Sequence, residues 1–155
     1  MKIAFIPASE EDCEQLTQVA KRAKQHWGYA DEWIQLWEED LAITPARFEN
    51  QKIVKGEMNG VLVGFYVLAY EDNLAELDGL WILPEYHGNG IGKTLFHHAI
   101  HQASAAGYSY LQLYADPHVD GFYQKLGGQM VGQVATKIAD RYLTIFQFQL
   151  EGIAG

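Results

Sequence analysis

Three glycines, Gly88, Gly90 and Gly92, alternate with other residues just before a segment that has the pattern of a helix. Glycine has no Cβ, so consecutive backbone N–H groups can converge on one point, and the first turn of a helix adds a partial positive charge. Such a turn can hold a phosphate. Its spacing fits neither a P-loop nor a dinucleotide fingerprint, whose last two glycines lie three positions apart. Taken alone, the turn is better explained by the close packing of a strand and a helix.

The residues around this turn indicate a family. Residues 80–95 read LWILPEYHGNGIGKTL, which resembles the acyl-CoA pyrophosphate loop of the GNAT acetyltransferase superfamily, usually written Arg/Gln-x-x-Gly-x-Gly/Ala. Gly90 and Gly92 match the small positions, and His87 stands where the family usually has Arg or Gln. A neutral histidine can donate one hydrogen bond to a phosphate oxygen, and a phosphate favours the protonated ring. We therefore expect CoA to bind more tightly below neutral pH.

A second block resembles the family's other signature, Asn-x-x-Ala-x-x-Phe-Tyr-x-x-x-Gly-Phe. Residues 116–127 read DPHVDGFYQKLG, in which Phe122, Tyr123 and Gly127 match directly. Asp116 replaces the usual Asn, and Gly128 replaces the final Phe. The two motifs occur in the family's order with a strand between them, and together they are far more specific than either alone.

Acetyl transfer from a thioester requires a neutral amine, a stabilised oxyanion and a proton for the departing thiolate. Strand alternation puts Glu76 and Asp78 on one face of the strand that leads into the turn, so either could accept the amine proton through water. A solvated or salt-bridged pair is the alternative for these carboxylates. The resemblance implies that Tyr123 is the general acid, and plain packing on the inner face of its helix is the other interpretation.

The resemblance also implies that pantetheine lies along the strand that ends at Leu83, with backbone N–H groups near Ile82 and Leu83 facing the thioester carbonyl. The expected residues of the acetyl-CoA site are Trp81, Ile82, Leu83, His87, Gly88, Asn89, Gly90, Ile91, Gly92, Lys93, Asp116 and Phe122.

Aromatic residues crowd the region after the first helix, which forms part of the acceptor wall in GNAT proteins. We expect Trp27, Tyr29 and Trp33 to contact the acceptor in a pocket for an apolar or cationic group. Trp33 and Trp37 also have the i, i+4 spacing of a core stripe. The sequence does not identify the acceptor.

Histidines at 97, 98 and 101 have helical spacing that could suggest a metal site. A zinc helix would normally contain His-Glu-x-x-His, and no acidic or cysteine partner accompanies these residues. We expect histidines on a helix surface and no metal.

Hydrophobic periodicity and turn signals predict one α/β domain over residues 1–155. The resemblance implies the GNAT-like fold, with a mostly antiparallel sheet of six to seven strands, splayed middle strands and helices on both faces. The Asn59-Gly60 pair predicts a hairpin. The predicted strands are 2–6, 51–58, 61–70, 74–83, 110–115, 129–137 and 142–150. The predicted helices follow Ser9 up to Gly28, lie within 31–40, begin near Thr44, and cover 90–106 and 118–126.

The composition narrows the class of function. Twenty acidic and eleven basic residues give a net charge of −9, which argues against nucleic-acid binding and favours a cationic partner. No apolar run is long enough to span a membrane, and no signal peptide is evident. A single cysteine, Cys13, is consistent with the reducing cytoplasm.

These observations predict an N-acetyltransferase that moves the acetyl group of acetyl-CoA to a primary amine of a small molecule or peptide, by direct attack in a ternary complex. A dimer is a reasonable expectation. The alternatives are an acyl-CoA-binding sensor or regulatory module without turnover, and a purely structural protein.

Overall fold

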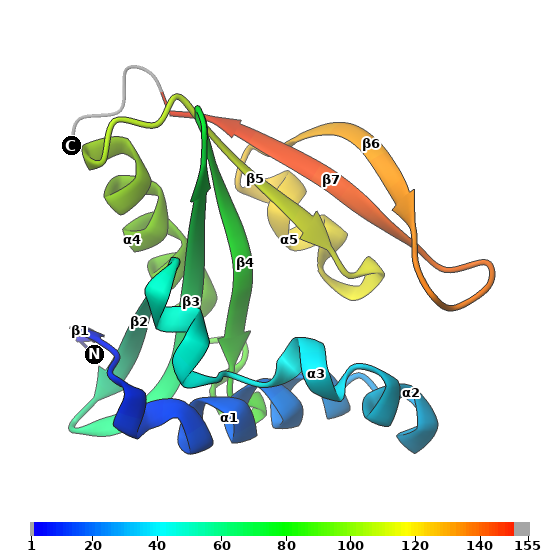
Figure 1. Cartoon of the computed structure of the whole chain (residues 1–155), viewed down its shortest axis with the longest axis horizontal. Coiled ribbons are helices and arrows are strands. Elements are labelled where there is room, and N and C mark those ends of the chain that lie inside the picture. The colour runs from blue at the N-terminus through cyan, green and yellow to red at the C-terminus, as the bar shows by residue number, and fades with distance from the viewer. Residues whose placement is uncertain (1, 151–155) are drawn as a thin grey trace. The chain divides into compact units, whose positions relative to one another are not determined.

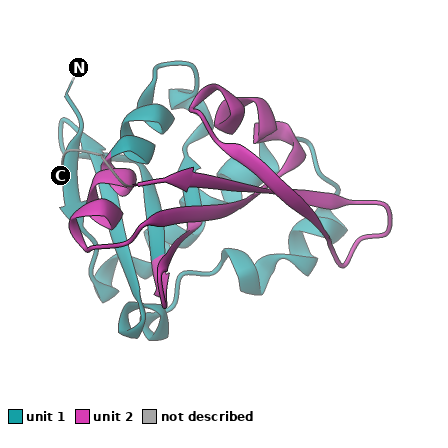
Figure 2. Ribbon diagram, turned by 90° about the horizontal axis from the view of Figure 1, so that it is seen from above, with its two compact units in different colours: residues 1–68, 79–97 teal, residues 69–78, 98–155 magenta. Residues whose placement is uncertain are grey.

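The structure, a computed structural model of the chain, describes residues 2–150 (Figure 1). These residues form two compact units, shown in different colours in Figure 2. Unit 1 contains residues 2–68 and 79–97, and unit 2 contains residues 69–78 and 98–150. Each unit is described by itself below.

Seven strands form one mixed sheet in the order β1-β2-β3-β4-β5-β7-β6. The β1–β2, β5–β7 and β6–β7 pairs are antiparallel, and the β4–β5 pair is parallel. The mixed sheet, predicted to be mostly antiparallel and to have six to seven strands, is therefore confirmed. The strands are β1 (Ala4–Pro7), β2 (Gln51–Met58), β3 (Val61–Glu71), β4 (Leu74–Ile82), β5 (Tyr110–Ala115), β6 (Gln129–Ala135) and β7 (Tyr142–Gln149).

The parallel pairing of β4 with β5 occupies the first residues of both strands. Its register runs from Leu74 opposite Tyr110 to Glu76 opposite Gln112. Strand β4 continues to Ile82 and β5 to Ala115.

In unit 1, the β2–β3 hairpin turns at Asn59 and Gly60, whose φ angles are 54° and 78°. Two positive φ angles are the requirement of a type I′ turn, whose twist matches that of the flanking strands. The hairpin predicted from this residue pair is confirmed.

The first helix of unit 1 starts at a capping box, in which the Asp12 carboxylate accepts a hydrogen bond from the Ser9 N–H at 2.8 Å. The 3-10 turn η1 (Glu10–Asp12) leads into α1 (Cys13–Gln25), and Gly28, with φ 80°, reverses the chain. Two short helices, α2 (Asp31–Leu36) and α3 (Glu38–Leu41), follow where one helix was predicted within 31–40. The helix predicted to begin near Thr44 is the 3-10 helix η2 (Pro45–Glu49).

Strand β4 is followed by the 3-10 turn η3 (Pro84–Tyr86), the glycine turn and α4 (Ile91–Ala105). The predicted strand, turn and helix are thus present, with helix boundaries within one residue of those expected. In unit 2, β5 leads into η4 (Pro117–Val119) and α5 (Asp120–Lys125), and β6 and β7 complete the chain that the structure describes. The inner sheet residues Leu111, Leu113, Phe146 and Phe148 are buried. Among residues 2–150, no helix has the length and apolar character needed to cross a membrane.

Candidate active site

The glycine turn prepares the N-terminus of α4 for an anion. Gly88 and Gly90 have φ angles of 83° and 77°, and a Cβ at either position would meet no atom within 4 Å. The need for glycine here is therefore one of backbone conformation and not of space. The Gly90 carbonyl accepts a hydrogen bond from the Thr94 N–H at 3.1 Å, which is the first helical bond of α4. An α-helix leaves the preceding N–H groups, including those of Ile91 to Lys93, without an intrahelical partner. These groups and the helix dipole suit a phosphate.

The backbone at the end of β4 corrects one expectation. The Leu83 N–H donates to the Val63 carbonyl of β3 at 2.9 Å, so it is not available to a thioester carbonyl. The Ile82 carbonyl accepts a hydrogen bond from His87 Nε2 at 3.0 Å. In a strand, the N–H and C=O of one residue point to the same side and those of the next residue to the opposite side. The Ile82 N–H therefore points away from β3, and it is the better placed of the two expected donors.

The His87 ring links the glycine turn to the end of β4 through its hydrogen bond to the Ile82 carbonyl. A carbonyl only accepts, so Nε2 carries the proton in this hydrogen bond to Ile82, and Nδ1 of the neutral ring is an acceptor. The ring also meets His26 edge to face at 4.8 Å and stacks on Trp27 at 6.0 Å between centroids. The expected donation from a neutral His87 to a phosphate is wrong for this conformation, because its one N–H is already used. Only the protonated ring would offer a second donor.

Side chains of α1 and of the residues just after it contact the same turn, and the sequence did not indicate these contacts. Arg22 Nη2 lies 2.8 Å from Glu85 Oε1 and 3.1 Å from Oε2. The backbone N–H of Glu85 itself and the Arg22 guanidinium both lower the pKa of this carboxyl. Arg22, His26 and Trp27 thus contact Glu85 and His87, and we call these five residues the α1 clasp. Its members come from segments about sixty residues apart, so no local pattern could have revealed it.

The two carboxylates of β4 are brought together in unit 2. Glu76 is half-buried and Asp78 is exposed, and a hydrogen bond joins their side chains. Burial, the charge and hydrogen bond of Asp78, and the charge of Glu71 raise the pKa of Glu76 to about 7. A carboxylate with a pKa near neutral is a suitable proton acceptor at physiological pH.

Tyr123 lies on α5 with 7% of its surface exposed. The centroid of its ring lies 5.0 Å from that of Phe122 and 6.0 Å from that of Phe146. Burial raises the pKa of its phenol well above the ordinary value, so the hydroxyl keeps its proton. A Cβ on Gly128 would lie 2.7 Å from Phe148 Cζ and 2.9 Å from Phe146 Cδ1. The rings of β7 therefore approach the place where the family motif has its final Phe, which explains the glycine.

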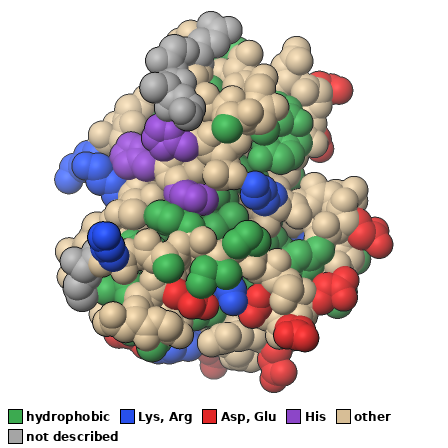
Figure 3. Space-filling view, turned by 90° about the vertical axis from the view of Figure 1, so that its left-hand side faces the viewer, with side chains coloured by type: hydrophobic (Ala, Val, Ile, Leu, Met, Phe, Trp, Pro, Cys, Tyr) green, Lys and Arg blue, Asp and Glu red, His purple; other side chains and the backbone are tan. Residues whose placement is uncertain are grey.

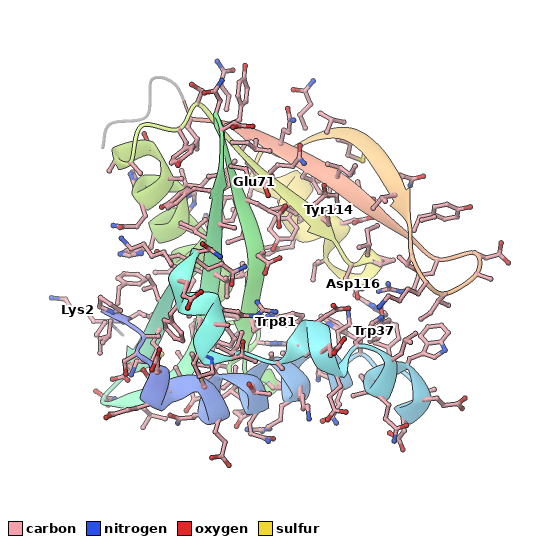
Figure 4. All side chains as sticks on the ribbon, in the orientation of Figure 1. Lys2, Trp37, Glu71, Trp81, Tyr114 and Asp116 are labelled. Atoms are coloured by element: carbon pink, nitrogen blue, oxygen red, sulfur yellow. The ribbon has the colours of Figure 1, made fainter. Side chains whose placement is uncertain are left out.

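Asp116, labelled in Figure 4 with Tyr114 of β5, is held by its own unit. Its Oδ2 accepts a hydrogen bond from Arg141 Nη2 at 2.8 Å, and its Oδ1 accepts from the His118 N–H at 3.0 Å and from His118 Nδ1 at 2.9 Å. Both carboxylate oxygens thus bind partners within the unit. The sequence around Asp116 did not indicate that Arg141 would be its partner.

The predicted acceptor residues divide into two groups. Trp27 belongs to the α1 clasp, whereas Tyr29 and Trp33 pack with Trp37. The Tyr29 ring lies 5.7 Å from Trp33 and 4.9 Å from Trp37, and Trp33 lies 5.9 Å from Trp37. Trp37 is 8% exposed, in agreement with its reading as a core residue. Trp81, the expected cofactor residue on β4, is half-buried.

His97 and His101 are exposed on α4, and His98 is half-buried. Figure 3 shows histidine side chains gathered on the face that it presents. Within residues 2–150, no three His, Cys, Asp or Glu side chains form a group that could hold a metal ion.

Comparison with known proteins places these features in a family. Residues 12–128 match the acetyltransferase (GNAT) family. An uncharacterized N-acetyltransferase, ycf52, of Pyropia yezoensis is 40% identical over 77 residues, which cover 48% of this chain and 44% of that relative. The match therefore spans less than half the length of this curated relative.

Solved structures share the fold over nearly the whole chain. A GCN5-related N-acetyltransferase from Rhodopseudomonas palustris has a TM-score of 0.81 at 22% identity, with 96% of both chains covered. The PaiA N-acetyltransferase from Thermoplasma acidophilum, solved in complex with coenzyme A, has a TM-score of 0.77 at 24% identity, with 96% of this chain and 99% of that chain covered. The family match covers both motifs and most of the sheet, and the chain belongs to the GNAT acetyltransferase family.

Proposed function

We propose that this chain is a single-domain N-acetyltransferase that moves the acetyl group of acetyl-CoA onto a primary amine by direct attack in a ternary complex. The observation that supports this most strongly is the glycine turn at the start of α4 in a GNAT family member. Positive φ angles at Gly88 and Gly90 expose the first N–H groups of the helix, which suit a diphosphate. Coenzyme A bound to a protein of the same fold is in keeping with this.

In this proposal, the diphosphate binds the N–H groups of Ile91, Gly92 and Lys93, next to Asn89, and the Lys93 ammonium adds a positive charge. Pantetheine extends along Trp81 and Ile82, and the Ile82 N–H stabilises the thioester oxyanion. Leu83 and His87 contribute through the shape of the turn. Asp116 and Phe122 complete the set of residues that we propose for the cofactor site.

The chemical step needs a base and an acid. The neutral amine nitrogen attacks the thioester carbon, and Glu76, or Asp78 beside it, takes one N–H proton as the C–N bond forms. The tetrahedral intermediate collapses as the C–S bond breaks, and Tyr123 gives its proton to the departing sulfur. An amide and free CoA are the products. The base then releases its proton to solvent, and Tyr123 regains one from solvent. Burial keeps the Tyr123 phenol protonated, which is the form that a proton donor must have.

Removing the Tyr123 hydroxyl tests this function. Free thiol released from acetyl-CoA is measured with a panel of primary amines, for the native protein and for Tyr123→Phe. We expect a fall in kcat of about 10²-fold or more, with the dissociation constant of CoA unchanged. Phe146→Leu, at a buried ring of β7 that packs on Tyr123, is the matched control for packing. If no amine in the panel raises thiol release above background while CoA still binds, the chain is a sensor and the proposal fails.

The setting of this reaction is also part of the proposal. The net charge of −9 favours a cationic small molecule or peptide as the acceptor and disfavours nucleic acid. The cytoplasm provides acetyl-CoA and a reducing environment for Cys13. The reaction uses no metal and no membrane, and the protein could act as a homodimer.

A further inference from the structure

An aromatic cluster in unit 1 holds an ammonium group of the chain itself. The cluster consists of Tyr29, Trp33 and Trp37, whose rings contact one another pairwise. Lys24 Nζ lies 4.3 Å from the centroid of the Trp37 ring and 5.3 Å from that of Tyr29. Trp37, labelled in Figure 4, lies at the junction of α2 and α3. The chain reversal at Gly28 is what brings these rings back to the last turn of α1.

This geometry is that of a binding site for an alkylammonium ion. The face of an aromatic ring attracts a cation within about 6 Å of its centroid, and tryptophan attracts it most strongly. Two rings attract the Lys24 ammonium at such distances, and the third contacts both of them. Lysine has a flexible stem of four carbons, so an external ammonium can replace Lys24 without a change in the backbone.

The charges around the cluster favour the same class of ligand. The helices α2 and α3 contain five acidic residues and no basic residue. All five are exposed: Asp31, Glu32, Glu38, Glu39 and Asp40. Glu38 pairs with Lys21 of α1 at 3.0 Å, so this surface already attracts an ammonium group from the chain. Such a field attracts cations and repels the phosphates of CoA.

We propose that the cluster of Tyr29, Trp33 and Trp37 binds a non-reacting ammonium group of the acceptor, and that Lys24 fills this subsite when the acceptor is absent. The proposal rests on the proposed acetyl transfer. The amine that attacks a thioester must be neutral, whereas the group held over the rings is charged. The acceptor therefore carries at least two amino groups on an alkyl chain, one held and one acetylated.

The alternative is that the Lys24 stem simply covers Trp37 and keeps water from it. Binding of a simple cation separates the two, because only a ligand subsite accepts a cation from outside the chain. Tetramethylammonium chloride is the probe, with sodium chloride at the same concentration as the control for ionic strength. The measurement is the movement of the tryptophan indole N–H signals in NMR spectra of the ¹⁵N-labelled protein, without acetyl-CoA.

We expect the signals of Trp33 and Trp37 to move on titration, while that of Trp81 serves as the internal reference. Lys24→Ala removes the competing ammonium and should lower the midpoint about two- to fivefold, the range expected for one exposed cation–π contact. Lys52→Ala, at an exposed lysine of β2, changes the net charge equally and should leave the midpoint unchanged. An unmoved midpoint in Lys24→Ala, or no movement of the Trp33 and Trp37 signals in either protein, would overturn the inference.

The acceptor class is tested separately with 1,4-diaminobutane and 1-aminobutane as substrates. We expect a higher kcat/KM for the diamine, and Tyr29→Leu should remove most of this advantage by raising KM. Equal use of both amines would overturn the inference and leave the proposed function intact. Thiol release with neither amine would count against the proposed function, whereas the NMR titration would still decide whether the cluster binds an ammonium ion.

Discussion

At the scale of single residues, the carboxyl of Glu76 is the group whose chemistry the fold changes most usefully. Its pKa rises to about 7 because it is half-buried and because the carboxylates of Asp78, on the same strand, and Glu71, at the end of β3, repel its negative charge. A raised pKa makes this carboxylate a stronger base than an exposed one. It also predicts a definite pH dependence for the proposed reaction.

With the acceptor saturating, kcat should rise with pH up to about 7 and level off above it, since the base acts only when it is ionised. Asp78→Asn removes the negative charge of Asp78 and the hydrogen bond of its carboxylate, both of which raise the pKa of Glu76. The rise of kcat with pH should therefore occur at lower pH. Glu71→Gln should cause a smaller shift in the same direction, because Glu71 is the weakest of the causes. The measurement is the pH–rate profile of the three proteins.

The opposite pattern would reassign the base. If Asp78→Asn abolishes turnover at every pH and Glu76→Gln retains it, Asp78 is the proton acceptor. If neither variant changes the profile, the ionisation seen in kcat belongs to another group, and the β4 carboxylates are only a solvated pair.

At the scale of elements, β4, the glycine turn and α4 form one strand–turn–helix motif, and its shape depends on the local backbone conformation of the turn. Gly90 has a φ of 77° and begins the hydrogen bonding of α4. The α1 clasp then holds the turn at Glu85 and His87. The direction of the first N–H groups of α4 therefore depends on residues that do not themselves contact a phosphate.

Gly90→Ala should weaken both folding and cofactor binding. A Cβ there meets no neighbour, so the cost is the strain of a left-handed conformation, about 1 kcal/mol or more. Gly60→Ala is the matched control, because Gly60 has nearly the same φ, 78°, and equally open surroundings in the β2–β3 turn. Urea unfolding should show similar losses of stability in both variants, and titration with acetyl-CoA should show weaker binding only in Gly90→Ala. Equal CoA affinity in the two variants would contradict the phosphate role of the turn.

At the scale of the whole molecule, the net charge of −9 opposes the approach of an anionic cofactor. Salt screens long-range repulsion, and the screening length is only about 8 Å at physiological ionic strength. The association rate of acetyl-CoA should therefore rise with potassium chloride concentration, whereas electrostatically steered complexes show the opposite trend. Stopped-flow measurement of association at several salt concentrations checks this.

A rate that falls with salt would mean that local positive charge at the turn outweighs the net charge of the chain. Lys93→Gln would then reduce the slope, because the Lys93 ammonium is the charged group nearest the first N–H groups of α4 in sequence. The native protein in a neutral osmolyte of equal viscosity controls for slower diffusion.

The sequence by itself determined the parts of this protein whose conformation is local. Asn59-Gly60 predicted a turn with two positive φ angles, and the glycines at 88–92 predicted the strand, turn and helix that the structure contains. Glycine conformations and helix caps depend on a few neighbouring residues, so they can be predicted without the fold. The two family motifs also allowed the order of the strands and helices along the chain to be predicted.

Only the tertiary structure decided how the side chains of the site are used. The Leu83 N–H and the Ile82 carbonyl have partners in β3 and on His87, and the sequence does not indicate either. Arg22 and Glu85 meet across 63 positions of sequence, and Lys24 reaches rings that the reversal at Gly28 returns to it. The pKa of Glu76 likewise depends on burial. Hydrogen-bond partners, ring contacts and burial arise from segments distant in sequence, and a local pattern contains no information about them.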